Sequence, residues 1–190
     1  DLARSRGLGD VYKRQYNRDG WCNYRKIEIK YEIMNFAIIG ASGNVGRKTI
    51  EILEKSKLAI DNLFLIASSK SAGNKIKFRN KEIEIEDLEN YNFSRAQITF
   101  FAAGSKVAKE WVPKAAKETI VIDNSSYFRM QKDVPLVVPE VNSEALNKHK
   151  NIIANPNCST MQMVLPLKPL HDEYKICLLY TSPSPRDLAR

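Results

Sequence analysis

The sequence predicts an α/β protein built on a doubly wound, mostly parallel sheet. Short apolar runs of strand length alternate with stretches of helical periodicity along residues 34–176, and each crossing has the length of a βαβ unit. A glycine-rich loop follows the first apolar run, and a single cysteine stands between the last strand and a helix. Because the carboxyl ends of parallel strands lie at one edge of a sheet, we expect both features to face one crevice.

The two ends of the chain lie outside this pattern. Both carry Asp-Leu-Ala-Arg, and segments 5–15 and 177–187 can be encoded by opposite strands of one piece of DNA. We interpret them as translated adapter DNA, which has no place in fold reasoning. We therefore expect 1–33 to be disordered upstream translation and 177–190 to be an artefact, with Met34 as the first native residue.

The composition argues against several kinds of partner. The chain has 30 Lys and Arg against 22 Asp and Glu, a net charge of +8, but residues 34–176 account for only half of it (20 against 16). They contain no basic run with interleaved aromatic residues, so we expect no nucleic-acid partner. There is no run of about 18 apolar residues to form a membrane span. Cys158 is the one cysteine of this segment, and no Cys/His spacing predicts a metal site, so we expect a cytoplasmic protein without metal.

The glycine loop has the context of a dinucleotide-binding loop. The apolar run 36–39 ends in Gly-Ala-Ser-Gly-Asn-Val-Gly at 40–46, and a helix follows at once. Glycines here allow a tight turn and a close approach of the backbone to a pyrophosphate, which then lies at the helix N-terminus. The spacing is a variant of the commoner G-x-G-x-x-G, and the alternative is a plain tight turn. The candidate cofactor-binding residues are Gly40, Ser42, Gly43, Asn44, Val45 and Gly46, and the predicted apolar face of the helix is Val45, Thr49, Ile52 and Leu53.

The loop after the next apolar run, 63–67, favours NADP over NAD. NAD-binding units often place an acidic residue here to bind the ribose 2′-hydroxyl. This chain has Ser69, Lys70 and Ser71 instead, and a cation with hydroxyls suits a 2′-phosphate. The alternative is that Lys70 is an ordinary solvated lysine. We include all three residues in the candidate cofactor site, which predicts a Rossmann-like NADP-binding domain.

The remaining elements follow from their apolar periodicity. In chain order we predict a hairpin or two short edge strands over 75–86, a strand over 98–102, a helix opened by Gly104 and kinked or broken at Pro113, strands over 119–122 and 136–138, a turn at 139–142, a brief helix over 143–148 and a strand over 152–154. Gly104 stands between a strand and a helix, as the first glycine loop does, and joins the candidate cofactor-binding residues.

Two residues after the later strands carry the predicted chemistry. Cys158 lies in Asn-Pro-Asn-Cys-Ser-Thr at 155–160, where a thiol at a helix N-terminus is favoured as the thiolate. The alternative is a small buried hydrophobe. Arg129 ends the polar loop after 119–122, and its planar fork matches a phosphate or carboxylate in two hydrogen bonds. The alternative for Arg129 is a surface arginine.

Several stretches together resemble the cofactor-binding half of the aspartate-semialdehyde dehydrogenase family. They are residues 40–46, 67–73, 122–130, 138–142 and 154–160. The resemblance implies NADP-dependent reduction of 4-phospho-L-aspartate to L-aspartate 4-semialdehyde through a cysteine thioacyl intermediate, in the route to lysine, threonine and methionine. It also implies that the full-length protein is a homodimer or homotetramer.

The resemblance also assigns roles. Cys158 would form the thioacyl intermediate with Asn157 beside it, and Arg129 would hold the phosphoryl group or inorganic phosphate. Gly43 to Gly46 would cradle the pyrophosphate, and Lys70 with Ser71 would take the 2′-phosphate, although many relatives carry arginine at the position of Lys70. On this basis 34–157 is an NADP-binding domain and 158–176 begins the catalytic helix and a second domain that is largely missing. We expect no steady turnover, because the family's remaining substrate-binding and acid/base residues lie beyond the point matching Ile176.

Two alternatives remain open from the sequence. N-acetyl-γ-glutamyl-phosphate reductase shares the glycine loop and the chemistry, but its cysteine motif runs Asn-Pro-Gly-Cys-Tyr where this chain has Asn-Pro-Asn-Cys-Ser. The other is a nucleotide-binding module without catalysis, which would keep its whole function without Cys158.

Overall fold

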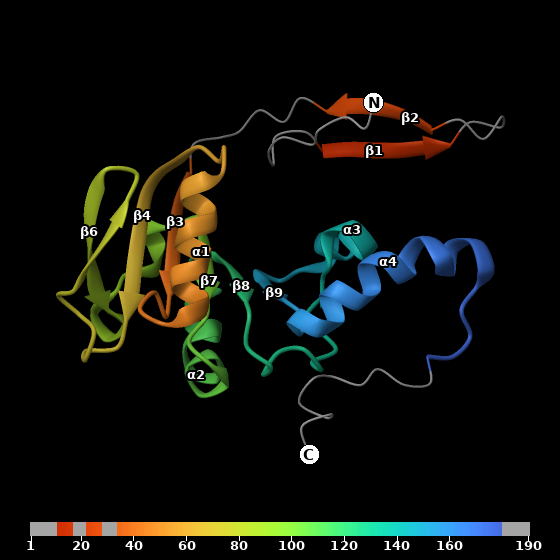
Figure 1. Cartoon of the computed structure of the whole chain (residues 1–190). Helices are drawn as coiled ribbons and strands as arrows, with labels where there is room; N and C mark the ends of the chain where they lie inside the picture. Colours follow the sequence, from red (N-terminus) through yellow and green to blue (C-terminus); the bar gives the residue numbers. More distant parts are fainter. Residues whose placement is uncertain (1–10, 17–21, 28–33, 180–190) are drawn as a thin grey trace, which may run out of the picture. The chain divides into compact units, whose positions relative to one another are not determined.

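The computed structural model describes residues 11–16, 22–27 and 34–179 (Figure 1). Two compact units, Asp1–Ala102 and Ala103–Arg190, make up the chain. The first unit holds the glycine loop, and the second holds Cys158 and Arg129.

Strands occur within the segment that precedes Met34. β1 (Val11–Tyr16) pairs antiparallel with β2 (Cys22–Ile27), in a register that joins Val11 to Ile27. This differs from the disorder expected over 1–33, and the β-branched and aromatic residues of both segments favour extended backbone. The other residues of that range, and residues 180–190, lie outside the described residues, and the adapter origin of both ends stays a prediction.

The first unit contains a mostly parallel sheet, and its first strand in chain order, β3, is an inner strand. From β3 (Met34–Ile39) the chain crosses through α1 (Asn44–Lys55) to the parallel strand β4 (Ile60–Ala67), and then reaches β6 (Lys81–Asp87) farther out on that side. β7 (Ile98–Phe101) pairs parallel with the other edge of β3. The strand order reverses at β3, and such a switch point is where open α/β sheets bind ligands.

The hairpin predicted over 75–86 is confirmed at the sheet edge. β5 (Lys75–Phe78) pairs antiparallel with β6, and the two residues between them, Arg79 and Asn80, have φ angles of 45° and 66°. Two successive left-handed residues match the right-handed twist of a hairpin. Two short 3-10 helices, η1 (Leu88–Asn90) and η2 (Phe93–Arg95), then lead into β7.

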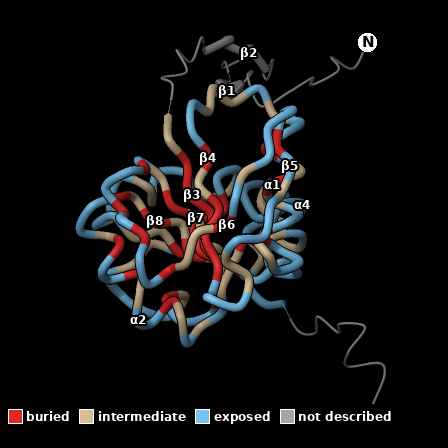
Figure 2. Tube along the Cα trace, turned by 90° about the vertical axis from the view of Figure 1, so that its left-hand side faces the viewer, coloured by how far each residue is buried: buried red, intermediate tan, exposed pale blue. Residues whose placement is uncertain are grey.

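The core of the first unit lies between α1 and the sheet. Alternate residues of the strands, such as Phe36, Ile38 and Leu65, meet Ile50 and Leu53 of α1, and Figure 2 shows the buried residues concentrated in the central strands. The predicted face of α1 is wrong in part, because Val45 is 46% exposed and Ile52 is 52% exposed. The buried face is Gly46, Ile50 and Leu53, since the close approach of Gly46 to the preceding loop fixes the rotation of the helix.

The second unit follows the predicted order with local differences. It contains α2 (Ser105–Ala115), β8 (Ile120–Asp123), α3 (Pro139–Asn142), a 3-10 helix η3 (Ser143–Lys148), β9 (Ile152–Ala154) and α4 (Cys158–Tyr174), and β8 pairs parallel with β9.

Three local predictions in this unit need correction. α2 is one helix that continues through Pro113 to Ala115, so the break expected at Pro113 is absent. The predicted strand at 136–138 makes only a single bridge, from Leu136 to Ala154. The predicted turn at 139–142 is the short helix α3, with Pro139 at its first position. Among the described residues, no helix has the length and apolarity needed to span a membrane.

Candidate active site and nucleotide loop

The glycine loop is anchored between β3 and β4. The backbone N–H groups of Gly40 and Ala41 both donate to the carbonyl of Ile66, at 2.8 and 3.1 Å. Gly40 has a φ of 85°, which an L side chain rarely adopts, and its carbonyl accepts from Gly43 N–H at 3.0 Å. The loop is thus a tight turn at the carboxyl end of β3.

The other two glycines serve different purposes. A Cβ on Gly46 would overlap the carbonyl oxygen of Gly40 and lie 2.8 Å from the Cα of Ala41, so Gly46 allows the helix to pack on the loop. A Cβ on Gly43 would lie 3.3 Å from that same oxygen, and Gly43 is exposed at the N-cap of α1. No side chain caps this helix, and its first turn has no acidic residue. The arrangement leaves the helix N-terminus open to an anion.

The structure adds Arg47 to this loop. Its Nε donates to the carbonyl of Ser42 at 3.1 Å, so a guanidinium lies against the loop backbone. Arg47 was not among the predicted site residues, because an arginine in an amphipathic helix is typical of the solvated face. Its position in the first turn after three glycines was the available signal.

The predicted 2′-phosphate residues lie in a turn at the end of the neighbouring strand. Ser71 N–H and Ala72 N–H both donate to the carbonyl of Ser68, at 2.8 and 3.2 Å. Ser69 and Lys70 are exposed on this turn. Because β3 and β4 are parallel neighbours, the turn and the glycine loop leave the same edge of the sheet.

In the second unit, Cys158 is the first residue of α4 and is exposed. The predicted strand, turn and helix are confirmed here, and the alternative of a buried cysteine is wrong. Asn157 is the N-cap, and its Oδ1 accepts from Ser159 N–H at 2.9 Å and from the thiol of Cys158 at 3.7 Å. The cap therefore fixes the helix start and contacts the sulfur.

Arg129 is half-buried and holds two strand ends together. Its Nε donates to the carbonyl of Asn155 at 3.0 Å, and its Nη2 donates to the carbonyl of Asn124 at 3.1 Å. Asn124 follows β8 and Asn155 follows β9. Arg129 is therefore held by the backbone, which argues against the alternative of a surface arginine. The Nη1 end of its guanidinium is engaged by neither carbonyl.

Gly104 precedes α2 as its N-cap with a φ of 82° and no side-chain cap. The next residue, Ser105, shares a hydrogen bond of 2.9 Å with the hydroxyl of Ser126. In the first unit, the glycine loop and the Lys70 turn thus lie at the same edge of the sheet. In the second unit, Arg129 contacts the end of the strand that leads to Cys158. Within the described part of the chain, no group of three His, Cys, Asp or Glu residues could hold a metal ion.

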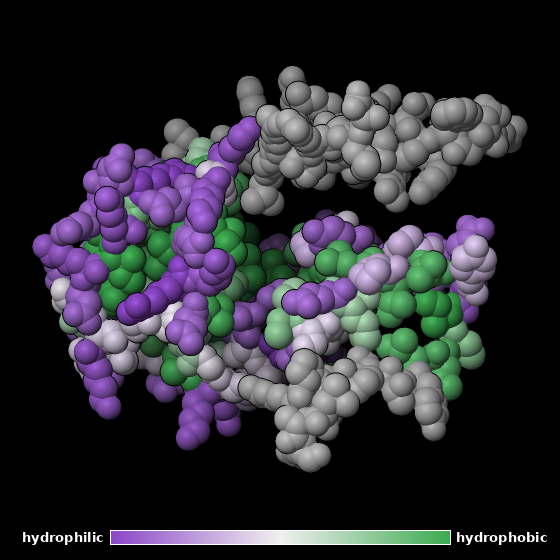
Figure 3. Space-filling model, in the orientation of Figure 1, coloured by the Kyte–Doolittle hydropathy of each residue, from purple (hydrophilic) through white to green (hydrophobic). Residues whose placement is uncertain are grey.

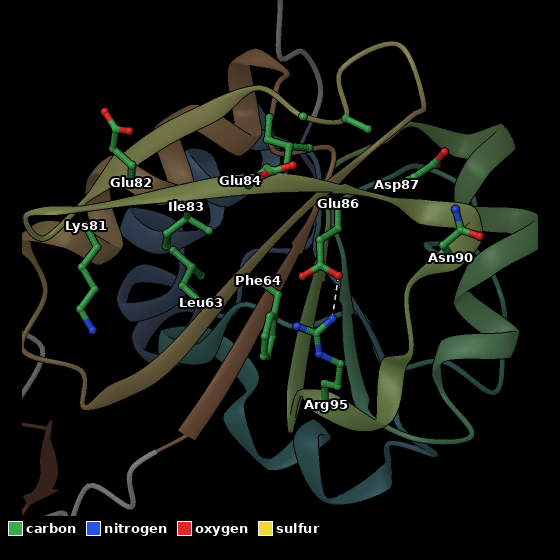
Figure 4. Close-up of a pocket in the computed structure, with 13 residues that line it drawn as sticks. Leu63, Phe64, Lys81, Glu82, Ile83, Glu84, Glu86, Asp87, Asn90 and Arg95 are labelled. Carbon is green, nitrogen blue, oxygen red and sulfur yellow. Dashed lines mark hydrogen bonds and ion pairs between the residues drawn. The ribbon is translucent and has the colours of Figure 1, made fainter.

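A pocket of about 710 Å³ lies elsewhere in the first unit and is lined mainly by residues of β4 and β6 (Figure 4). Arg95 lies 4.2 Å over the ring of Phe64 and forms an ion pair of 2.6 Å with Glu86. None of the predicted site residues lines this pocket.

Residues 35–149 match the semialdehyde dehydrogenase family, NAD-binding domain. The chain belongs to this family. It is 50% identical over 145 residues to the aspartate-semialdehyde dehydrogenase of Shewanella sp. (strain DB6705), a match that covers 75% of this chain and 43% of the relative. It is also 50% identical over 141 residues to the enzyme of that name from Aquifex aeolicus (strain VF5), covering 72% of this chain and 42% of the relative. The chain thus spans less than half the length of these relatives.

Solved structures of the same class share the fold. Aspartate semialdehyde dehydrogenase II from Vibrio cholerae, complexed with ASA, has a TM-score of 0.73 and 44% identity, covering 75% of this chain and 47% of that one. The enzyme from Candida albicans, solved with NADP, has a TM-score of 0.65 and 29% identity, covering 75% and 48%. The predicted doubly wound, Rossmann-like fold and the family resemblance are confirmed.

Proposed function

We propose that this chain is the nucleotide-binding part of an NADP-dependent aspartate-semialdehyde dehydrogenase, with Cys158 as its nucleophile. The observation that carries the proposal is the exposed thiol at the start of α4, capped by Asn157, in the same unit as the clamped Arg129. Family membership and the names of the similar proteins support it.

The residues of the first unit fit an NADP molecule. The open N-terminus of α1 and the exposed Gly43 suit a pyrophosphate, because Gly43 has no side chain to hold a ligand away from the backbone. The exposed Lys70, with Ser69 and Ser71, suits the 2′-phosphate. When bound, the reduced cofactor supplies the hydride that converts a thioester to an aldehyde.

The second unit supplies the acyl chemistry. The thiolate of Cys158 attacks the acyl carbon of 4-phospho-L-aspartate and forms a carbon–sulfur bond. The bond between the acyl carbon and the bridging phosphate oxygen then breaks, and inorganic phosphate leaves with the electron pair. Arg129 binds the phosphoryl group through the Nη1 end that its backbone clamp leaves free. Asn157 contacts the sulfur and fixes the turn that presents it.

A single-turnover experiment tests this proposal. The chain is mixed with 4-phospho-L-aspartate, released phosphate is measured, and Cys158 is examined by mass spectrometry. We expect about one equivalent of phosphate and an acyl adduct on Cys158 with the native sequence, and neither with Cys158→Ala. A folded native chain that releases no phosphate would contradict the proposal, and faster release from N-acetyl-γ-glutamyl phosphate would favour the alternative reductase.

A further inference from the structure

A buried carboxylate lies beside the proposed phosphate-binding arginine and has no part in the chemistry above. Asp123 is the last residue of β8 and has no exposed surface. Its Oδ1 accepts from Ser125 N–H at 3.1 Å, and its Oδ2 accepts from the Ser125 hydroxyl at 2.6 Å. Burial of a carboxylate is costly unless hydrogen bonds or a paired charge compensate it, and Ser125 supplies two such bonds here. Burial raises the pKa of Asp123, and the bonds from Ser125 and the charge of Arg129 oppose that rise.

The bonds of Asp123 bend the loop that ends in Arg129. Ser125 is itself buried, and its hydroxyl oxygen accepts from Tyr127 N–H at 3.2 Å. Asp123, Ser125 and Tyr127 thus form two successive side-chain-to-backbone turns. The loop returns on itself, so that Arg129 reaches back to the carbonyl of Asn124 next to Asp123.

The same strand end is tied to the segment that leads to Cys158. The carbonyl of Asp123 accepts from Asn155 N–H at 2.8 Å, and the side-chain amide of Asn155 donates to Oδ1 of Asn124 at 2.7 Å. The Nε of Arg129 also donates to the carbonyl of Asn155, so Arg129 joins the same strand end. Of the five N–H donors of Arg129, two are therefore used on the backbone, and their direction decides where the other three point.

We propose that Asp123 is a positioning residue that, through Ser125, sets the loop so that Arg129 presents its free N–H donors to an oxyanion such as phosphate. The proposal rests on the proposed function, in which Arg129 binds phosphate. Asp123 acts through Ser125 and Arg129 and does not touch the anion.

The direction of the effect separates positioning from plain electrostatics. Asp123→Asn removes a negative charge near Arg129, so a purely electrostatic role predicts tighter binding of an anion. A positioning role predicts weaker binding, because Asn has one acceptor oxygen in place of two and cannot accept both the N–H and the hydroxyl bond of Ser125.

The test uses inorganic phosphate, titrated against the folded 190-residue chain by calorimetry. We expect Asp123→Asn and Ser125→Ala to weaken phosphate binding about tenfold or more, and Ser125→Thr, which keeps the hydroxyl, to bind within a few-fold of the native chain. Asp133→Asn is the matched control, because Asp133 is exposed, lies ten residues farther along the chain, and its substitution makes the same change in charge. Tighter or unchanged binding by Asp123→Asn would overturn the proposal.

A second readout is independent of phosphate. The Nε–H resonance of Arg129, assigned by its loss in Arg129→Lys, should be protected from exchange in the native chain and in Ser125→Thr, and lost in Asp123→Asn and Ser125→Ala. If the native chain binds no phosphate, the proposed function of Arg129 fails, and this resonance alone decides the positioning role. A protected resonance in Asp123→Asn would contradict that role.

Discussion

At the scale of single residues, Gly46 decides how α1 meets the glycine loop. A methyl group there would overlap backbone atoms of Gly40 and Ala41, which cannot move aside as a side chain can. We expect Gly46→Ala to lower the free energy of unfolding by about 2 kcal/mol or more, since overpacking outweighs the better helix propensity of alanine. Urea unfolding measures this. Gly43→Ala is the control, with a clearance of 3.3 Å and a smaller expected loss; equal losses would contradict the packing argument.

Asp123 gives a pH dependence with a definite sign. Its pKa is raised in the folded protein above the ordinary value of 3.8, mainly by burial, so protonation favours the folded state. The stability that this carboxyl contributes is present in full below pH 3.8 and is lost as the pH rises through its folded pKa. We expect the difference in melting temperature between the native chain and Asp123→Asn to shift in favour of the native chain between pH 7 and pH 4. A shift in the opposite direction would show that the charged form is the one stabilised by folding.

At the scale of elements, the start of α4 depends on Asn157. Its Oδ1 accepts the N–H of Ser159 and satisfies one of the donors left free at a helix start. We expect Asn157→Ala to destabilise the second unit by about 1 kcal/mol, and Asn157→Ser to keep most of that stability, because serine caps about as well as asparagine. Thermal unfolding followed by circular dichroism compares the two variants. Equal melting temperatures for Ala and Ser would rule out the capping role.

The elements also show what could be predicted from the sequence. The strands β3, β4 and β9 could be predicted, because short apolar runs between turn residues have few other interpretations. The orientation of α1 could not be predicted, since the packing of Gly46 does not change the pattern of apolar side chains in the sequence.

The candidate site divides in the same way. The glycine loop and Cys158 were predicted from residue types at a strand-to-helix turn. The sequence did not predict the buried hydrogen bonds of Asp123 or the backbone bonds of Arg129. A polar loop has the same composition whether its side chains face solvent or one another.

At the scale of the whole molecule, the described chain leaves apolar surface along α4, which contributes no buried residue. Leu165 is 41% exposed and Leu170 is 49% exposed, and apolar surface is visible in this region in Figure 3. We expect the chain to associate as its concentration rises, and Leu170→Lys to reduce that association. Sedimentation velocity measures it, with Ile52→Lys on α1 as the matched control. Equal effects of both substitutions would show that α4 is not the surface responsible.

Binding of NADP by the glycine loop and the Lys70 turn is tested by a fluorescence titration of the folded chain with NADPH and with NADH. We expect saturable binding, with NADPH bound at least about tenfold more tightly, and we expect Lys70→Ala to remove most of that preference because a charge-assisted bond to the 2′-phosphate is lost. Lys75→Ala, which removes an exposed lysine of β5, should leave the preference intact. A folded chain that binds neither nucleotide would contradict the proposed role of the glycine loop, and a preference for NADH would contradict the proposed role of Lys70.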